Sequence, residues 1–471
     1  MRNQSPFSRY LILYIPWLLA WIVQSLPILS YFIAWSGSLL IFAATISGWV
    51  KPIPKDLTLS EQLMRPLFMI QLIFAGYMCV GSIFYFLNVL GYVDFHLVTN
   101  KIYRIDTAQL NLTAECQRYY VLGHAAFVTG ILRNMNYPIP KKYFIEKSTI
   151  TSLLLKIAFV ALLVSTTIGR LPGFTQLYWQ FANLSFISGT LALALAIPQK
   201  RILSTLVCSV LYVINFYTAL TSGFKEPIIV SVLVLGIFLY PNYKRIVVIT
   251  FIPILLLLFI FLPKFNQVFR ESAWKEGVDI DDAYELALDA TIESEESGET
   301  SNWDFLTGRL SEIGMFTQYV ESTPKHIDYY SFEIVRQSII SLVPREIWPE
   351  KPVTEILVMK RVYAAGVTGS ISVVSAKPAF IVDCYLSFGA IGIFIFLYLY
   401  GMIAQRISQT AEYLFGGYLL GTALIFSGLF QSLWRGLSFE FIANSVFWSF
   451  ISMLIIFQFL KILNVLKKYI N

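Results

Sequence analysis

Charged residues are scarce in this sequence, and their scarcity limits what the chain can be. Of its 471 residues only 14% are Asp, Glu, Lys or Arg, while 56% are hydrophobic. Soluble domains average about 25% charged residues, so too few polar side chains exist here to coat them. Disorder is excluded too, because 16% of the residues are aromatic and disordered segments are poor in aromatics. The composition predicts a polytopic, all-α membrane protein.

Cysteine is equally rare, which removes two further classes of protein. Of the four cysteines, Cys79, Cys208 and Cys384 lie in apolar stretches, and no CxxC pair occurs. The sequence therefore offers neither a disulfide framework nor a zinc site, and we expect no metal and no cofactor. The net charge of +6 does not indicate nucleic-acid binding, because Lys and Arg in membrane proteins gather beside the spans on the cytoplasmic side.

Long apolar runs are what the sequence has in abundance. A membrane-spanning helix needs about 20 mainly apolar residues, and the runs predict about twelve such helices. They cover residues 9–24, 28–50, 66–90, 118–133, 150–168, 175–196, 202–221, 227–240, 246–263, 378–404, 412–432 and 441–460.

The distribution of Lys and Arg predicts the orientation of these helices. With a cytoplasmic N-terminus, 18 Lys and Arg fall on inner segments and six on short outer loops, and the remaining 11 lie in one long outer loop. Because basic residues favour the cytoplasmic side, we expect both termini in the cytoplasm. The chain then divides into a nine-span bundle at 1–263, a large extracytoplasmic loop at 264–377, and three C-terminal spans at 378–471.

The first part of the large loop is acidic. Residues 271–300 hold eleven Asp or Glu against one Lys, and such a block is typically solvated and loosely structured. The triplet Asp279-Ile280-Asp281 has the form of a metal-binding DxD motif, but so acidic a stretch produces that triplet easily by chance.

The second part, from about residue 303 to 343, shows helical periodicity. Apolar residues recur every three or four positions, which predicts two amphipathic helices suited to the membrane interface. Leu306, Leu310, Ile313, Phe316 and Val320 mark the first helix; Phe332, Val335, Ile339 and Leu342 mark the second, which ends before Pro344.

Outward-facing cations are the first group of candidate binding residues. They bracket one outer mouth beside Gly and Pro turns, where Arg can bind phosphate in a bidentate manner and Lys acts as a point charge. A lipid-linked diphosphate would suit such a mouth, and an ordinary lipid-headgroup contact is the alternative explanation for each cation. The candidates are Arg170, Lys225, Arg309, Arg345 and Lys351.

Acidic residues and histidine are the second group of candidates. Asp383 lies inside an apolar run, where a carboxylate is a functional hypothesis by default, and a hydrogen bond to a neighbouring helix is the alternative. Glu312 follows Arg309 by three residues, which a helix-surface ion pair also explains. His326 is the only histidine in the large loop. We rank Glu312, Asp383 and His326, in that order, as candidates for a catalytic base.

Three segments resemble a known family. Residues 342–352 (LVPREIWPEKP) resemble the PRxxWPxKP stretch of bacterial O-antigen and oligosaccharide repeat-unit polymerases (Wzy-type). The RLSE sequence at 309–312 and the segment 379–392 (AFIVDCYLSFGAIG), with its Phe-Gly turn, are also similar. Residues 221–227 (TSGFKEP) match too, except that the family often has Arg where this chain has Lys225. The resemblance covers roughly residues 220–400.

This resemblance implies metal-independent glycosyl transfer on the periplasmic side of a bacterial inner membrane. A glycan on undecaprenyl diphosphate would be the donor, and a second lipid-linked repeat unit the acceptor, so that surface polysaccharide such as O-antigen, capsule or exopolysaccharide is polymerised. The cations would stabilise the diphosphate leaving group, and one of the three candidate bases would deprotonate the acceptor hydroxyl. A chain-length regulator and a flippase are the implied protein partners.

Two other functions remain open on the sequence. An O-antigen ligase shares a many-span body with a large outer loop and differs mainly in its acceptor. A flippase or transporter of lipid-linked oligosaccharide is the non-enzymatic alternative, although it would favour more polar groups at mid-membrane depth.

Overall fold

The protein is a bundle of helices with almost no strand. The computed structural model describes residues 8–98, 105–171, 175–224, 226–292, 302–308, 310–369, 377–434 and 436–468. About 76% of the chain is helical, and eight helices are long and apolar enough to cross a membrane. These features fit the all-α membrane class that the composition predicts.

The bundle helices follow one another through most of the chain. They are α1 (Ser8–Leu11), α2 (Ile15–Ile22), α3 (Pro27–Ile46), α5 (Pro66–Ile73), the π-helix η2 (Phe74–Val80), α6 (Ile83–Val89), α7 (Thr107–Asn134), α8 (Lys147–Ile168), α9 (Thr175–Ala196), α10 (Ile202–Leu220), α11 (Glu226–Arg270), α17 (Phe380–Phe415), α18 (Tyr418–Phe426), the π-helix η4 (Ser427–Gln431), α19 (Ser432–Trp434) and α20 (Phe439–Ile462).

The remaining elements are short or belong to the segment 264–377. They are α4 (Leu59–Gln62), a π-helical turn (Glu271–Glu276), α12 (Ile280–Ile292), α13 (Asn302–Gly308), α14 (Ile313–Ser322), α15 (Glu333–Leu342), α16 (Thr354–Ala364), and the two-residue strands β1 (Tyr92–Val93), β2 (His96–Leu97), β3 (Tyr143–Phe144) and β4 (Lys467–Lys468).

The eight long apolar helices differ in number from the twelve predicted spans for identifiable reasons. The run at 9–24 forms a 15-residue apolar stretch, Ser8–Ile22, and the run at 412–432 forms another short one, Tyr418–Gln431. The run at 118–133 is part of α7, which contains more polar residues than a typical span. The two runs at 227–240 and 246–263 both lie in α11.

Helix α11 is a hairpin of two antiparallel arms. Its backbone leaves the helical region at Tyr243 (φ −134°, ψ 45°). The Arg270 Nε–H donates to the Gly223 carbonyl across 2.8 Å, and a Cβ on Gly236 would lie 3.0 Å from the Phe251 ring. Over this length a straight helix would separate Gly223 from Arg270 by about 70 Å at 1.5 Å per residue. The chain therefore turns back at Tyr243.

Helix α17 contains a second sharp turn, near its beginning. Phe388 and Gly389 have non-helical backbone angles, and the Phe380 ring lies 5.3 Å from the Tyr400 ring. The short arm Phe380–Ser387 therefore folds back against the long arm that follows. Gly389 has φ +62°, and a Cβ there would lie 2.8 Å from the Tyr329 hydroxyl, so both the conformation and the space require glycine.

The segment 328–332 forms hydrogen bonds with the backbone carbonyl groups that lack a helical partner at this turn. The Tyr330 N–H donates to the Leu386 carbonyl at 2.9 Å, and the Ser331 N–H donates to the Ser387 carbonyl at 3.0 Å. Irregular backbone inside a helical bundle is tolerated where neighbouring segments complete its hydrogen bonds in this way.

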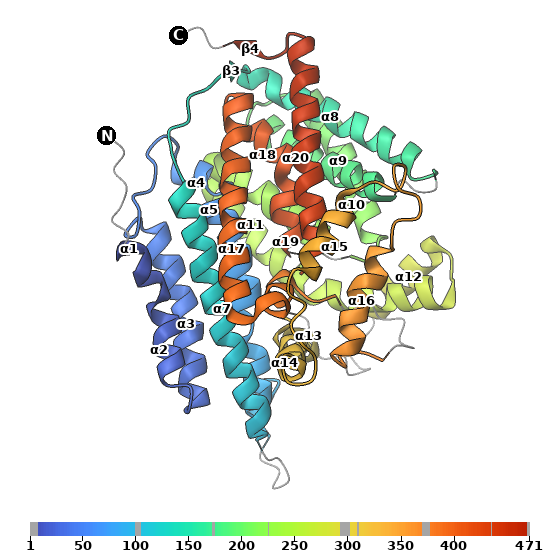
Figure 1. The fold of residues 1–471 in the computed structure, drawn as a ribbon. Helices are drawn as coiled ribbons and strands as arrows, with labels where there is room; N and C mark the ends of the chain where they lie inside the picture. Colours follow the sequence, from blue (N-terminus) through green and yellow to red (C-terminus); the bar gives the residue numbers. More distant parts are fainter. Residues whose placement is uncertain are drawn as a thin grey trace.

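The two ends of the bundle differ in what covers them (Figure 1). At one end, which we call the strand end, β3 pairs antiparallel with β4, so the connection between α7 and α8 lies beside the C-terminal segment. At the other, the loop end, the segment 264–377 packs on the bundle, with α14 against α7 and α15 against α20.

A buried ion cluster ties the strand end together; we call it the Arg65 cluster (Arg65, Asp56 and Glu412). The Arg65 guanidinium lies 2.6 Å from an Asp56 oxygen and 2.9 Å from a Glu412 oxygen. It also stacks over the Tyr137 ring at 3.6 Å. The cluster joins α17 to the loops around α4 and after α7.

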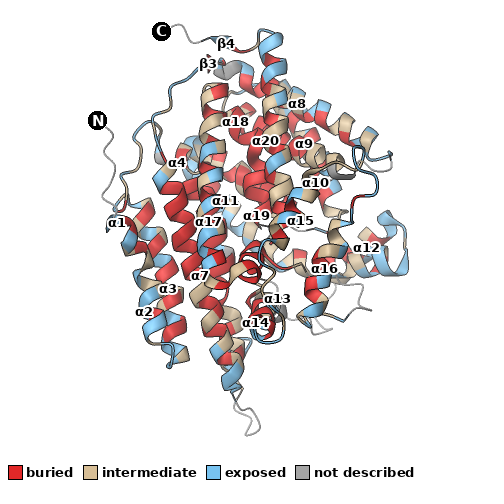
Figure 2. Cartoon of the chain, in the orientation of Figure 1, coloured by how far each residue is buried: buried red, intermediate tan, exposed pale blue. Residues whose placement is uncertain are grey.

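The core follows the contact between α7 and α17. Both helices are buried along most of their length, while α2 and α3 expose much of their surface (Figure 2). A Cβ on Gly130 would strike the Tyr398 backbone, and one on Gly401 would strike the Phe127 backbone. Small residues thus allow the two helices to approach closely, as is common between membrane helices.

The amphipathic helices of the large loop differ from prediction in two respects. The single helix predicted across Leu306 to Val320 is broken into α13 and α14, because Glu312 adopts a left-handed conformation (φ +53°) and the Ser311 carbonyl accepts a hydrogen bond from the Tyr120 hydroxyl at 2.9 Å. The prediction of one continuous helix was therefore wrong.

Helix α15 forms where it was predicted and ends before Pro344, but it buries a different face. Ile334, Ser338 and Ser341 are buried, whereas Phe332 and Ile339 are exposed. Polar residues face the bundle because they have partners there: the Ser341 hydroxyl donates to the Glu440 carbonyl at 3.1 Å. Of the apolar stripe, Phe332 and Ile339 are therefore exposed, while Val335 and Leu342 are half-buried.

Candidate functional site

Among the described residues, the most buried ion pairs lie at the loop end, in what we call the Arg361 cluster (Arg361, Asp383 and Glu440). Arg361 of α16 is 3.1 Å from an Asp383 oxygen and 2.8 Å from a Glu440 oxygen, and the three side chains are 0–2% exposed. Asp383 belongs to the short arm of α17 and Glu440 to the first turn of α20. One guanidinium thus joins three segments that are distant in sequence.

Hydrogen bonds fix the geometry of this cluster. The Arg361 guanidinium donates through Nη1 and Nη2 to the two Glu440 oxygens at 2.8 and 3.0 Å, and Nη1 also donates to the Gln337 amide oxygen at 2.9 Å. The Phe439 backbone N–H donates to Asp383 Oδ2 at 2.8 Å. Bidentate pairing of this kind holds a guanidinium in one orientation.

The pKa of Arg361 depends on its burial and on its two acidic partners. Burial alone lowers the pKa of Arg361, but the carboxylates of Asp383 and Glu440 more than offset this effect and raise that pKa above its ordinary value. Arg361 is therefore a permanent cation. Two acids against one base leave one carboxyl group in excess at a site without contact to bulk water.

Asp383, one of the predicted bases, makes structural contacts in this cluster, and with its partners it joins α16 and α20 to α17. A catalytic role for Asp383 stays a prediction. Its partner Arg361 was not among the predicted site residues. One feature of the sequence indicates that Arg361 is buried: it is a cation that lies beside the apolar residues Val358 and Val362 of α16.

The other two predicted bases lie at the two ends of α14. Glu312 is half-buried and is the N-cap residue of α14, and the Ser311 carbonyl before it accepts from Tyr120 of α7. His326 is exposed in the connection between α14 and α15, where its backbone N–H donates to the Ser322 carbonyl. Glu312 and Asp383 both act on the charge of Tyr319 in α14.

The predicted cations are distributed over several turns. Arg345 is half-buried and its Nη1 lies 3.4 Å from the Pro349 carbonyl. Lys351 is buried, and its ammonium donates to the Ser341 and Val343 carbonyls at 3.2 and 2.7 Å, at the end of α15. Burial and then the neighbouring Arg345 lower the pKa of Lys351. Arg170 is exposed after α8. Lys225 and Arg309 lie outside the described residues.

One turn of α7 carries polar groups that the sequence analysis passed over. The Tyr119 hydroxyl donates to Glu115 Oε1 at 2.8 Å, and the Arg118 Nη1 donates to the Ser30 hydroxyl at 3.0 Å. All three α7 residues are half-buried. Glu115 lay outside the predicted span, which began at Arg118, whereas α7 begins at Thr107, after the Asp106 side chain accepts from the Ala108 and Gln109 N–H groups.

Aromatic rings surround this turn at the loop end. The Tyr119 ring lies 5.0 Å from Tyr385 and 6.0 Å from Phe316, and Tyr385 lies 5.9 Å from Tyr329. These rings come from α7, α14, α17 and the segment before α15. Aromatic side chains with polar tips commonly line binding sites for ligands that are partly apolar and partly polar.

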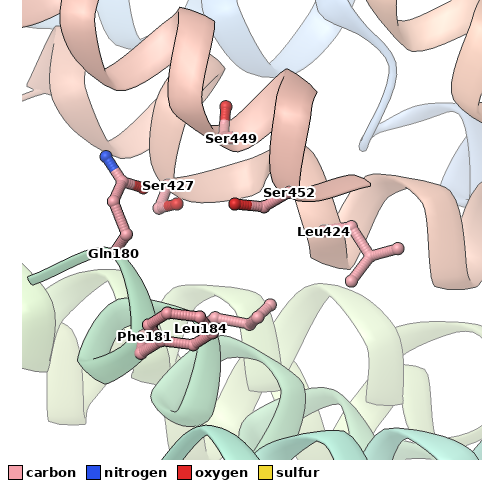
Figure 3. Close-up of a pocket in the computed structure, with 7 residues that line it drawn as sticks. All are labelled: Gln180, Phe181, Leu184, Leu424, Ser427, Ser449 and Ser452. Carbon is pink, nitrogen blue, oxygen red and sulfur yellow. The ribbon is translucent and has the colours of Figure 1, made fainter. Parts of the chain in front are cut away.

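Two hollows lie elsewhere. The first is between α9, α18, η4 and α20 and is lined by Gln180, Ser427, Ser449 and Ser452 with three apolar residues (Figure 3). Its volume of about 10 Å³ suits a single water molecule and excludes a larger ligand. The second, of about 490 Å³, lies at the strand end near Ser47, Lys55 and Gln62, away from the candidate residues of the loop end.

The chemistry available at the loop end is that of a polar site on an apolar bundle. It combines half-buried cations, a half-buried carboxylate and tyrosine rings. Among the described residues no group of three or more His, Cys, Asp or Glu side chains is placed to hold a metal ion.

Comparison with known proteins gives one match. Residues 15–468 match a family model described as a domain of unknown function, DUF8712. No curated protein and no solved structure matches the chain.

Proposed function

The chain belongs to the DUF8712 family, and we propose that it polymerises lipid-linked oligosaccharide repeat units by glycosyl transfer at the loop end of a membrane-embedded bundle. In this proposal the donor is a glycan on undecaprenyl diphosphate and the acceptor is the terminal sugar of another lipid-linked unit. The loop end faces the periplasm, and the protein is a metal-independent glycosyltransferase of a bacterial inner membrane.

The observation that carries the proposal is the position of the segment that resembles repeat-unit polymerases. Residues 342–352 lie against α20, where the Trp448 indole N–H donates to the Leu342 carbonyl at 3.2 Å, and the Lys351 ammonium fixes the turn to the end of α15. The similar segment 379–392 contains Asp383 of the Arg361 cluster. The family-like stretches thus gather at one end of the bundle.

The proposal includes twelve crossings with both termini in the cytoplasm. Two antiparallel arms in α11, together with α7 and the two shorter apolar stretches, support this count. An even number of crossings returns the C-terminus to the side of the N-terminus. The strand end is the cytoplasmic side in this proposal, because Lys51, a predicted inner cation, lies there and donates to the Leu132 and Met135 carbonyls at the end of α7.

Charge and apolar surface support a lipid-linked diphosphate as substrate. The loop end offers Arg118 and Arg345 at half-buried positions, and the neighbouring helices expose large apolar side chains, among them Leu19 and Ile391. Arginine binds phosphate in a bidentate manner, while the apolar surface suits a polyprenyl chain.

Gene deletion tests the proposal directly. A gel of the surface glycan from the deletion strain is expected to lack the long ladder and to retain a single attached repeat unit. Polymer that accumulates on the undecaprenyl carrier would indicate a ligase instead, and repeat units that remain on the cytoplasmic face would indicate a flippase.

Substitution tests the placement of the site. Arg345→Ala and Arg309→Ala, expressed in the deletion strain, are expected to shorten the glycan, with Lys360→Ala on the exposed side of α16 as the control. Normal chain length in both arginine variants would remove these residues from the site.

A further inference from the structure

The outer turns of α7 combine two groups that glycosyl transfer requires. Glu115 and Arg118 are three residues apart on one helix, so their Cβ atoms are about 5–6 Å apart. Among the described residues no ion pair within 4.0 Å joins them, because Glu115 bonds to Tyr119 and Arg118 to Ser30. The two charges attract each other across this spacing, but neither side chain is tied to the other by a direct hydrogen bond.

Each of the two side chains retains hydrogen-bonding capacity. A carboxylate has two oxygens, and only Oε1 of Glu115 accepts from the Tyr119 hydroxyl. A guanidinium has five N–H donors in a fixed fork, and the bond to Ser30 uses one nitrogen of Arg118. Both side chains are half-buried, a position that lowers the local dielectric and strengthens a contact to a charged ligand.

The surroundings of the turn are rigid. Asp106 caps the start of α7, the Gln109 amide donates to the Thr317 hydroxyl of α14 at 2.9 Å, and the Tyr120 hydroxyl donates to the Ser311 carbonyl. Ser30, which accepts from Arg118, donates in turn to the Ala20 carbonyl of α2 at 2.8 Å. A cation and a carboxylate are thus held in fixed relation, which catalysis requires.

The tyrosines beside Glu115 suit a sugar. Tyr119 and Tyr329 are half-buried, and Tyr385 stands between them at 5.0 and 5.9 Å. A pyranose presents C–H groups on its faces, which pack on aromatic rings, and hydroxyl groups at its edge, which donate to a carboxylate. The turn at Phe388 and Gly389 holds Tyr329 in place, since its hydroxyl occupies the space that a Cβ of residue 389 would take.

From this arrangement we propose that Glu115 is the catalytic base for the acceptor sugar and Arg118 the cation for the donor diphosphate. This inference rests on the polymerase function proposed above. The acceptor hydroxyl oxygen forms a bond to the anomeric carbon of the donor while its proton passes to the Glu115 carboxylate. The bond between that carbon and the diphosphate oxygen breaks, and its electron pair leaves with the diphosphate, whose added charge Arg118 stabilises.

Tyr119 is a positioning residue in this scheme. Its hydroxyl holds one Glu115 oxygen, which leaves the second oxygen for the acceptor. Removing that hydroxyl with Tyr119→Phe is expected to lower transfer less than removal of the carboxylate itself, because the base remains and only its orientation loosens.

Two measurements on purified full-length protein in nanodiscs separate the roles. Undecaprenyl diphosphate is the probe for binding, and transfer is followed with lipid-linked repeat units extracted from the deletion strain. Glu115→Gln is expected to bind the probe as the wild type does and to lose transfer about 100-fold or more. Arg118→Ala is expected to bind the probe about tenfold more weakly, or worse.

Matched variants control for folding and charge. Glu321→Gln removes an exposed carboxylate at the end of α14 and is expected to change neither quantity. Glu115→Asp keeps the carboxylate and is expected to restore part of the transfer. Retained probe binding in Glu115→Gln shows that this variant folds.

These experiments separate an error in the roles of Glu115 and Arg118 from an error in the proposed polymerase function. If Glu115→Gln and Arg118→Ala give a full-length glycan ladder in the deletion strain, the two roles are wrong while the polymerase function stands. If transfer falls equally in Glu115→Gln and Glu115→Asp and probe binding is lost in both, Glu115 is a structural residue. If deletion of the gene leaves the glycan unchanged, both the function and the inference fail.

Discussion

The Arg65 and Arg361 clusters lie at opposite ends of the bundle and share one composition: a buried arginine between two carboxylates. They differ in access to water. In the Arg65 cluster Asp56 is 19% exposed and Glu412 is 9% exposed, whereas in the Arg361 cluster neither acid is exposed at all. In addition Arg65 stacks on Tyr137, while Arg361 relies on Gln337 and on its two acids.

This difference indicates two kinds of anchor. Asp56 has access to water and can be hydrated if Arg65 is lost, so that only one acid of the Arg65 cluster, the buried Glu412, is left without a cation. An acid sealed from water has no substitute partner, and breaking a buried pair leaves an uncompensated charge. The Arg361 cluster holds α16, and with it the segment 342–352, on α17 and α20. We therefore expect the loop end to depend on the Arg361 cluster more than the strand end depends on the Arg65 cluster.

The largest effect is expected from Arg361→Ala. Two buried carboxyl groups lose their cation, at a cost of about 3–5 kcal/mol in the free energy of unfolding. The variant is expected to accumulate poorly in membranes, as measured by immunoblot, and to melt at a lower temperature in detergent. Lys360→Ala on the same helix is the control, because Lys360 is exposed. Wild-type stability of Arg361→Ala would contradict the view that the cluster anchors the loop.

Arg65→Ala is expected to be milder. Asp56 can be hydrated in the absence of Arg65, so we expect a loss of about 2–3 kcal/mol, close to that of a charged hydrogen bond. The melting temperature of the purified protein should therefore fall less than in Arg361→Ala. Lys55→Ala, an exposed neighbour, serves as the control. A larger effect in Arg65→Ala than in Arg361→Ala would reverse the comparison.

A third, smaller effect concerns pH: the contribution of Asp56 to stability should decrease in acid. Hydrogen bonds from Arg65 lower the pKa of Asp56 below 3.8 despite its partial burial. A group with a lowered folded-state pKa contributes stability above its unfolded pKa and loses that contribution as the pH falls through the folded-state value. The difference in melting temperature between wild type and Asp56→Asn is therefore expected to be constant near neutral pH and to shrink below about pH 3.8.

The smallest effect is expected at an exposed pair of the same residue types. Arg336 bonds to Glu333 at 2.7 and 2.8 Å on the surface of α15, and together with Gln337 it lowers the pKa of Glu333 to about 2. Because exposed pairs contribute little to stability, Glu333→Gln should melt at the wild-type temperature. A clear loss of stability would show that geometry matters more than burial, and would remove the basis for ranking the two clusters.

Much of the fold was predictable because apolar character is read locally. The all-helical class, the positions of most bundle helices and the end of α15 before Pro344 follow from runs and periodicity. The break between α13 and α14 was not predictable from periodicity, since it depends on a hydrogen bond from Tyr120, a residue of another helix. The buried face of α15 was missed because the partner of Ser341 lies on α20.

The candidate site was predictable in type but only partly in detail. Asp383 attracted attention as a carboxylate in an apolar run, and it is indeed buried, but its partner Arg361 is recognised only in the folded chain. Glu115 was overlooked because the boundary of its helix was placed too late. The catalytic roles of Glu312, Asp383 and His326 and the binding roles of the five cations stay predictions.

The sequence by itself determined the class of this protein, because each residue contributes its own preference for lipid or water and these preferences sum along a run. The tertiary structure alone decided which of the few charges meet. Arg65 and Glu412 are 347 residues apart in the chain, and a contact over that distance depends on how helices pack. Hydrophobicity is a property of single residues, whereas an ion pair is a property of two positions in space.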